Sequence, residues 1–125
     1  MNLTNEVHIL GRLTTHVLDT STGTPARRLK LSLFRIDGTS RQLLKDTATN
    51  DDGRCDGPLL EGGQVEVGTY EIVFQTGAYF AGKPGVANPP FLNEVPVRFT
   101  ISDASAHYHV PLLVSPWSYS TYRGS

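Results

Sequence analysis

The stretch VPVRFTI (95–101) places apolar side chains at every second position, with Pro96, Arg98 and Thr100 between them. Such an alternation is typical of a β-strand with one face on a hydrophobic core. The stretch HYHVPLLV (107–114) follows after a short polar segment and places Tyr108 and Val110 on the same face as two later apolar residues. Two strands this close along the chain predict a β fold.

Working outward, similar alternation predicts further strands at 28–33 and 70–75, with weaker candidates at 13–19, 41–49 and 118–123. Glycine-containing turns separate these segments, at 22–25, 37–38, 51–53 and 61–63. One stretch, 76–83, breaks the pattern and predicts a short helix that ends at Gly82 and is stopped by Pro84. The loop 85–93 contains Pro89-Pro90 and is expected to be extended. Seven or eight short strands predict an all-β sandwich.

The 125 residues correspond to one domain, and 11 Lys and Arg against 12 Asp and Glu give a net charge of −1. This balance argues against a basic nucleic-acid-binding protein. The single cysteine, Cys55, excludes an intrachain disulfide. No apolar run reaches the roughly 18–20 residues of a membrane span, and residues 1–10 lack the apolar core of a secretory leader. We therefore expect no membrane association and a cytoplasmic location.

Histidines and one arginine are the residues most able to carry chemistry. His107 and His109 face away from the predicted core, on a partly apolar surface that also carries Leu113. That surface indicates a second subunit or a ligand, although two solvated histidines would give the same pattern. The pattern does not fix the direction of His16, and a structural histidine is the common alternative. Arg54 is either a solvated turn residue or a clamp for an anion or a carbonyl group.

Other chemistries have weaker support. His16, His107 and His109 would suffice for a catalytic zinc site, but no fixed spacing supports one. A Ser-His-Asp triad lacks its nucleophile motif, and His16 and Asp19 fall on opposite faces of one strand. No glycine-rich phosphate-binding motif is present. Cys55 is interpreted as structural or incidental.

The C-terminal part of the sequence resembles the 5-hydroxyisourate hydrolase family, the transthyretin-related proteins. The resemblance rests on HYHVPLLVSP (107–116) and on YSTYRGS (119–125), whose closing Tyr-Arg-Gly-Ser is the hallmark of the enzymes. LTTHVLD (13–19), GTPA (23–26) and DGR (52–54) match the other family motifs. The similarity covers 13–125 as a single domain and leaves 1–12 as an N-terminal extension.

Transthyretin shares the scaffold but is a hormone carrier, so a binding protein without turnover is the alternative. The carrier has lysine in place of His16, threonine in place of His109, and no Tyr-Arg-Gly-Ser ending. This chain has the enzyme's residue at each of these positions.

The resemblance implies a transthyretin-like sandwich of about eight strands with one short helix. It also implies a homotetramer, a dimer of dimers, with active sites in the channel where the dimers meet. The implied reaction is hydrolysis of 5-hydroxyisourate without a metal or organic cofactor. His16, Arg54 and His109 would be catalytic, while substrate would be bound by Ser120, Tyr122 and Ser125 with its terminal carboxylate.

Overall fold

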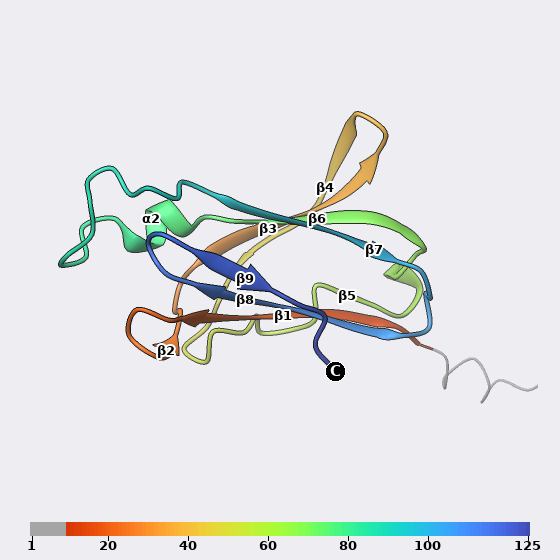
Figure 1. The fold of residues 1–125 in the computed structure, drawn as a ribbon. Coiled ribbons are helices and arrows are strands. Elements are labelled where there is room, and N and C mark those ends of the chain that lie inside the picture. Colours follow the sequence, from red (N-terminus) through yellow and green to blue (C-terminus); the bar gives the residue numbers. More distant parts are fainter. Residues whose placement is uncertain (1–9) are drawn as a thin grey trace, which may run out of the picture.

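The computed structural model describes residues 10–125, which form two β-sheets packed face to face (Figure 1). The first sheet has the strand order β2-β1-β8-β9, with β5 also paired to β1. Its strands are β1 (Arg12–Asp19), β2 (Thr24–Pro25), β5 (Leu60–Glu61), β8 (His107–Val114) and β9 (Tyr119–Thr121).

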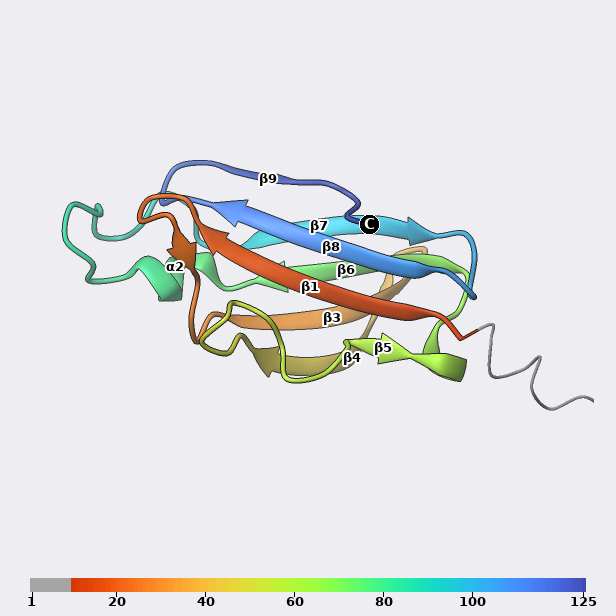
Figure 2. The ribbon, with the colours of Figure 1, turned by 90° about the horizontal axis from the view of Figure 1, so that it is seen from below.

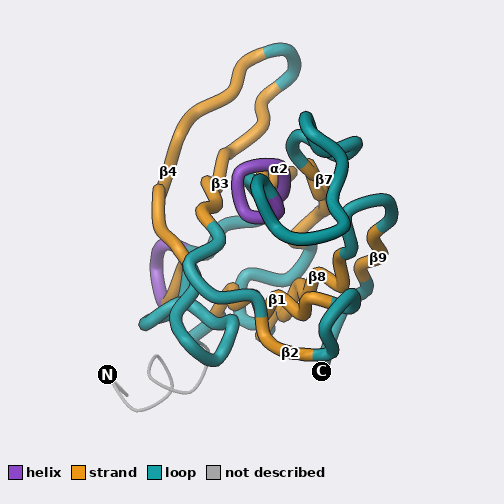
Figure 3. Tube along the Cα trace, turned by 90° about the vertical axis from the view of Figure 1, so that its left-hand side faces the viewer, coloured by secondary structure: helices purple, strands orange, loops and turns teal. Residues whose placement is uncertain are grey.

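The second sheet has the strand order β4-β3-β6-β7. Its strands are β3 (Lys30–Asp37), β4 (Ser40–Ala48), β6 (Gly68–Phe74) and β7 (Val95–Ile101). A 3-10 helix, η1 (Gly62–Gln64), follows β5, and the short helix α2 (Thr76–Phe80) follows β6. Figure 3 views the molecule from the end where α2 lies, with the sheets to either side of the interior.

The core lies between the two sheets because each strand turns alternate apolar side chains inward. Tyr70, Phe74 and Phe80 are among its largest fully buried members. Tyr108 and Val110 of β8 are also buried there, as the alternation of 107–114 predicts.

One strand pairing determines where the candidate site residues of β1 and β8 meet. β1 and β8 are parallel neighbours, whereas every other strand pair in the two sheets is antiparallel among residues 10–125. In their register Thr14 lies opposite His109 and His16 lies opposite Pro111. Paired positions share a face of the sheet, so side chains from both strands project together.

The predicted all-β sandwich with one short helix is confirmed. Nine strands occur within 10–125 because β2 and β5 are two-residue pairings in segments predicted as turns. The helix ends at Phe80 rather than at Gly82, because Ala81 leaves the helical conformation, with φ −56° and ψ 128°. The loop 85–93 is bent rather than uniformly extended.

The predicted extension, 1–12, lies mostly outside the described residues, and so does His8. Strand β1 begins at Arg12, the last residue assigned to that extension. Within residues 10–125, no helix combines the length and the apolar character needed to cross a membrane.

Candidate active site

The outer face of the first sheet collects polar side chains from β1 and β8. On β1, Leu13 and Val17 point into the core, so Thr14 and His16 point outward and are half-buried. On β8, His107 and His109 also point outward. The structure therefore agrees with the predicted direction of the β8 histidines. It also fixes the direction of His16, which the sequence pattern left open.

A tight turn brings Arg54 against His16. Gly53 has φ +75°, and its carbonyl accepts a hydrogen bond of 2.8 Å from Val17 N. A Cβ atom at this position would lie 2.4 Å from the Val17 carbonyl oxygen, so the turn needs glycine both for its φ and for its close approach. The result is an isolated antiparallel bridge between His16 and Arg54.

The same turn sets the proton position on His16. The ring Nε2 lies 3.0 Å from the backbone oxygen of Asp52. Because a carbonyl oxygen only accepts, Nε2 carries the hydrogen and donates it. A neutral His16 therefore keeps its lone pair on Nδ1.

The C-terminal tail returns alongside β8. Gly124 N donates a 2.7 Å hydrogen bond to the His109 carbonyl oxygen, and the two residues form an isolated bridge. Arg123 stacks its guanidinium 4.1 Å from the centre of the Tyr108 ring and donates to the His107 carbonyl oxygen at 3.3 Å. These contacts hold the tail along β8, so that Ser125 lies near His107 and His109 on the outer face of the sheet.

The converging elements line an open pocket of about 510 Å³. Arg12 and Thr14 of β1, residues 54–58, His107 and His109 of β8, and Ser125 contribute to its wall. Figure 2 shows β1 and β8 side by side, with the loop after β4 running along the other side of β1. His16 is not among the lining residues; it is bridged to Arg54, which lines the pocket, and lies one diagonal step from His109 in the strand register. Strand geometry separates their Cα atoms by roughly 8 Å.

The pocket lowers the pKa of His109 below the ordinary 6.5. Partial burial is the largest cause, followed by the positive charge of Arg54 and then by His107 and His16. His109 is therefore a neutral base near neutral pH. Within residues 10–125 the Arg54 guanidinium forms no ion pair, so it can meet an oxygen of a ligand.

Sequence reasoning missed Thr14. Its Oγ1 lies 2.8 Å from His109 Nδ1 and 3.0 Å from His107 Nε2. The available signal was its position two residues before His16, which places both on one strand face. The other missed residue, Arg12, lies two positions earlier on the same face.

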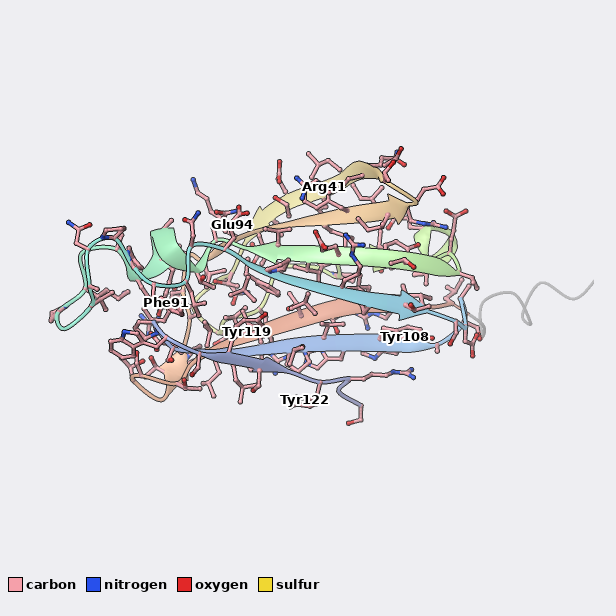
Figure 4. All side chains as sticks on the ribbon, turned by 45° about the horizontal axis from the view of Figure 1, so that its top comes forward. Arg41, Phe91, Glu94, Tyr108, Tyr119 and Tyr122 are labelled. Atoms are coloured by element: carbon pink, nitrogen blue, oxygen red, sulfur yellow. The ribbon has the colours of Figure 1, made fainter. Side chains whose placement is uncertain are left out.

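Ser120 and Tyr122 lie outside this pocket within a single chain. Ser120 is exposed on β9, opposite Leu113. Tyr122 lines a separate hollow of about 320 Å³, whose wall includes Phe99 and Tyr108. Figure 4 shows Tyr122 beside the tail that follows β9. One chain thus brings Arg54, His109 and Ser125 together and has His16 beside Arg54, whereas Ser120 and Tyr122 lie apart.

Three alternative chemistries, a reactive cysteine, a Ser-His-Asp triad and a metal site, find little support in the geometry. Burial raises the pKa of Cys55, which favours the thiol over the reactive thiolate. Asp19 is buried on the opposite face from His16 and accepts a hydrogen bond of 2.8 Å from Tyr79 Oη. Within the described part of the chain, no three His, Cys, Asp or Glu side chains gather as metal ligands.

The chain is similar to proteins of a known family over most of its length. The model of the HIUase/Transthyretin family matches residues 13–124. "5-Hydroxyisourate hydrolase 2" of Rhizobium meliloti (strain 1021) is 57% identical over 116 residues, which cover 92% of this chain and 97% of the relative.

Two solved structures extend the comparison. An (S)-allantoin synthase structure superposes with a TM-score of 0.86 at 50% identity, covering 93% of this chain but only 44% of that one. Sea bream transthyretin in complex with thyroxine superposes with a TM-score of 0.81 at 27% identity, covering 90% and 94% of the two chains.

Proposed function

Since this chain belongs to the HIUase/Transthyretin family and is one of its hydrolases, we propose that it opens the ring of 5-hydroxyisourate with His16, Arg54 and His109. The product is 2-oxo-4-hydroxy-4-carboxy-5-ureidoimidazoline, an intermediate between urate and allantoin. The observation that carries the assignment is one pocket that holds both a histidine with a lowered pKa and a guanidinium that forms no ion pair within residues 10–125. His109 has a lowered pKa, and Arg54 is among the causes of that shift.

In the proposed reaction, water attacks the carbonyl carbon of the cyclic amide while a histidine takes its proton. His109, or His16 beside Arg54, acts as this base, and the other histidine positions the substrate or passes the proton to the leaving nitrogen. Arg54 stabilises the negative charge that develops on the carbonyl oxygen. A fixed donor of this kind contributes about 2.7–4 kcal/mol to the transition state. The C–N bond then breaks, and no metal or organic cofactor takes part.

Substrate binding extends beyond one chain in this proposal. Ser125 lines the pocket, whereas Ser120 and Tyr122 lie elsewhere on the same chain. We propose a homotetramer, a dimer of dimers, in which these residues complete sites where two dimers meet. The half-buried Leu18 and Leu113 on the outer sheet face are suited to such a contact.

A transthyretin-like carrier without turnover is the second candidate, favoured by the superposition on a thyroxine-bound transthyretin. The carrier and the hydrolase predict different results in one assay. Urate oxidase generates 5-hydroxyisourate in a cuvette, the protein is added with and without EDTA, and the ultraviolet decay is followed. We expect decay far above the spontaneous rate and insensitive to EDTA. Decay at the spontaneous rate would support the carrier, and EDTA-sensitive decay would support a metal-dependent hydrolase.

Substitution then tests the assigned residues. His109→Ala and His16→Ala should each lower kcat by at least about 10²-fold, the usual contribution of a general acid or base. Arg54→Ala should sharply lower kcat/KM. Sedimentation must show the same assembly as the wild type, and near-normal turnover in both histidine variants would refute their assignment.

We further propose a cytoplasmic location. The bacterial origin of the Rhizobium meliloti relative and the single half-buried Cys55 are compatible with it, since disulfides are typical of exported proteins. Fractionation of cells producing the protein tests this location directly.

A further inference from the structure

The hydroxyl of Thr14 links the two histidines of β8. Its Oγ1 is 2.8 Å from His109 Nδ1 and 3.0 Å from His107 Nε2, while the two ring centres are 6.5 Å apart. The threonine projects from β1 directly opposite His109 in the parallel register. Because threonine is branched at Cβ, its χ1 is restricted and its hydroxyl is held in place. The reaction proposed above assigns this hydroxyl no role.

Because the Thr14 hydroxyl carries a single hydrogen, the tautomer of His107 and the tautomer of His109 depend on each other. A hydroxyl donates one hydrogen, so Thr14 can donate to one ring nitrogen and must accept from the other. If His107 donates to Thr14, Thr14 donates to His109 Nδ1, and His109 carries its own hydrogen on Nε2. If Thr14 donates to His107, His109 carries its hydrogen on Nδ1, and its Nε2 has a free lone pair.

Only the second arrangement makes His109 a base toward the pocket. Within residues 10–125, His109 Nε2 has no hydrogen-bond partner, whereas Nδ1 is occupied by Thr14. The neighbouring ring atom Cδ2 lies against Gly124, where a Cβ would come within 2.6 Å. When Nε2 takes a proton, the Nδ1 hydrogen continues to point at Thr14, so no hydroxyl has to reverse.

We propose that Thr14 and His107 are positioning residues that hold His109 in its Nδ1-protonated tautomer, with Thr14 donating to His107. The inference rests on the proposed function of His109 as a base and deepens it. The charged and titratable side chains around this chain of hydrogen bonds are Arg12 and His16 of β1, and Arg54, Cys55 and Asp56 of the adjacent loop. None of them is hydrogen-bonded to Thr14 Oγ1 in the described residues.

The decisive measurement is the tautomer itself, read from long-range proton–nitrogen correlations of labelled protein above the ordinary histidine pKa of about 6.5. In the wild type we expect hydrogen on His109 Nδ1. Thr14→Val removes the hydroxyl and keeps the branched shape, so hydrogen should move to Nε2, the form imidazole favours in water. His107→Ala should shift the population in the same direction, because the hydroxyl is then free to donate to His109. Thr14→Ser should keep the wild-type tautomer.

Kinetics separate positioning from a merely structural role. Thr14→Val should lower kcat about tenfold or more with little change in KM, since a general base contributes 10²–10⁴-fold. Thr14→Ser should restore most of the turnover. Thr69→Val, at a strand threonine of the other sheet, is the matched control and should leave both constants unchanged.

The tautomer of His109 and the turnover of His109→Ala test different claims, the positioning by Thr14 and the catalytic role of His109. An unchanged His109 tautomer in Thr14→Val would overturn the positioning role even if His109→Ala is inactive. A tautomer that follows Thr14, combined with normal turnover in His109→Ala, would support the positioning and refute the catalytic assignment. A lowered kcat that Thr14→Ser fails to restore would also overturn the proposal.

Discussion

At the residue scale, the two histidines of the site are prepared differently by their surroundings. His16 donates from Nε2 to the Asp52 carbonyl, so its basic nitrogen is Nδ1. His109 has its Nδ1 beside Thr14, and burial together with Arg54 lowers its pKa. Identical side chains thus present different nitrogens, and the difference comes from their neighbours on β1 and the 50–54 turn.

The lowered pKa of His109 predicts a pH dependence. A base works only when deprotonated, so kcat/KM should fall as the pH drops through the pKa of His109 in the free enzyme. This pKa lies below 6.5, so activity should persist at a pH where an unperturbed histidine would already be protonated. A pH profile of kcat/KM and an NMR titration of His109 measure the two quantities independently.

Arg54→Gln should raise the pKa of His109 toward its ordinary value. The substitution removes a positive charge that disfavours the protonated ring, while the larger effect of burial stays in place. Arg27→Gln removes an exposed charge outside the pocket and should leave the titration unchanged. An unaltered His109 titration in Arg54→Gln would contradict the electrostatic coupling between the two residues.

At the element scale, alternation revealed much of the fold but not the pairing that builds the site. The inner faces of β7 and β8 could be predicted because a period of two is a local property of the chain. The parallel pairing of β1 with β8 could not, since Thr14 and His107 are 93 residues apart and no local pattern specifies their contact. The turn at 51–53 was predicted, whereas its bridge to His16 depends on the fold.

Gly53 is the point where the turn and β1 meet, and Gly53→Ala should destabilise the protein. An L-residue with φ +75° costs about 1–2 kcal/mol, and the added Cβ would also press on the Val17 carbonyl. Gly63→Ala is the matched control, because a Cβ there meets nothing within 4 Å. Urea unfolding should show a lower midpoint for Gly53→Ala only, and equal midpoints would contradict the tight approach.

Gly124 makes a different contact, between the tail and the ring of His109. A Cβ there would lie 2.6 Å from His109 Cδ2, so Gly124→Ala must displace either the ring or the tail. We expect lower kcat with little change in the urea midpoint, because the tail is peripheral to the core. Full activity in Gly124→Ala would show that the tail does not fix the position of His109.

At the scale of the whole molecule, one chain brings together only some of the residues predicted for the site. The pocket is open, and Tyr122 lies in another hollow between the sheets' edges. The family resemblance predicted residues from more than one subunit at each site. That expectation could not come from composition or alternation, because neither describes contacts between chains.

Leu113→Glu tests the proposed assembly. The side chain is half-buried on the outer sheet face, so a charge there should break contacts between dimers while leaving each chain folded. Analytical ultracentrifugation should show smaller species, and turnover should fall. Leu43→Glu, on an exposed position of β4, should keep both assembly and activity. A persistent tetramer in Leu113→Glu would place the interface elsewhere.

The parallel β1–β8 pairing also governs when the pocket first exists during protein synthesis. A ribosome releases Thr14 and His16 long before His107 and His109, and Gly124 emerges later still. The candidate residues of β1 are therefore synthesised well before the residues of β8 with which they form the pocket. Such distant pairings are also the slow ones to form, because the entropy of closing a long loop must be overcome first. We therefore expect the pocket to form only late in folding, after β8 has paired with β1.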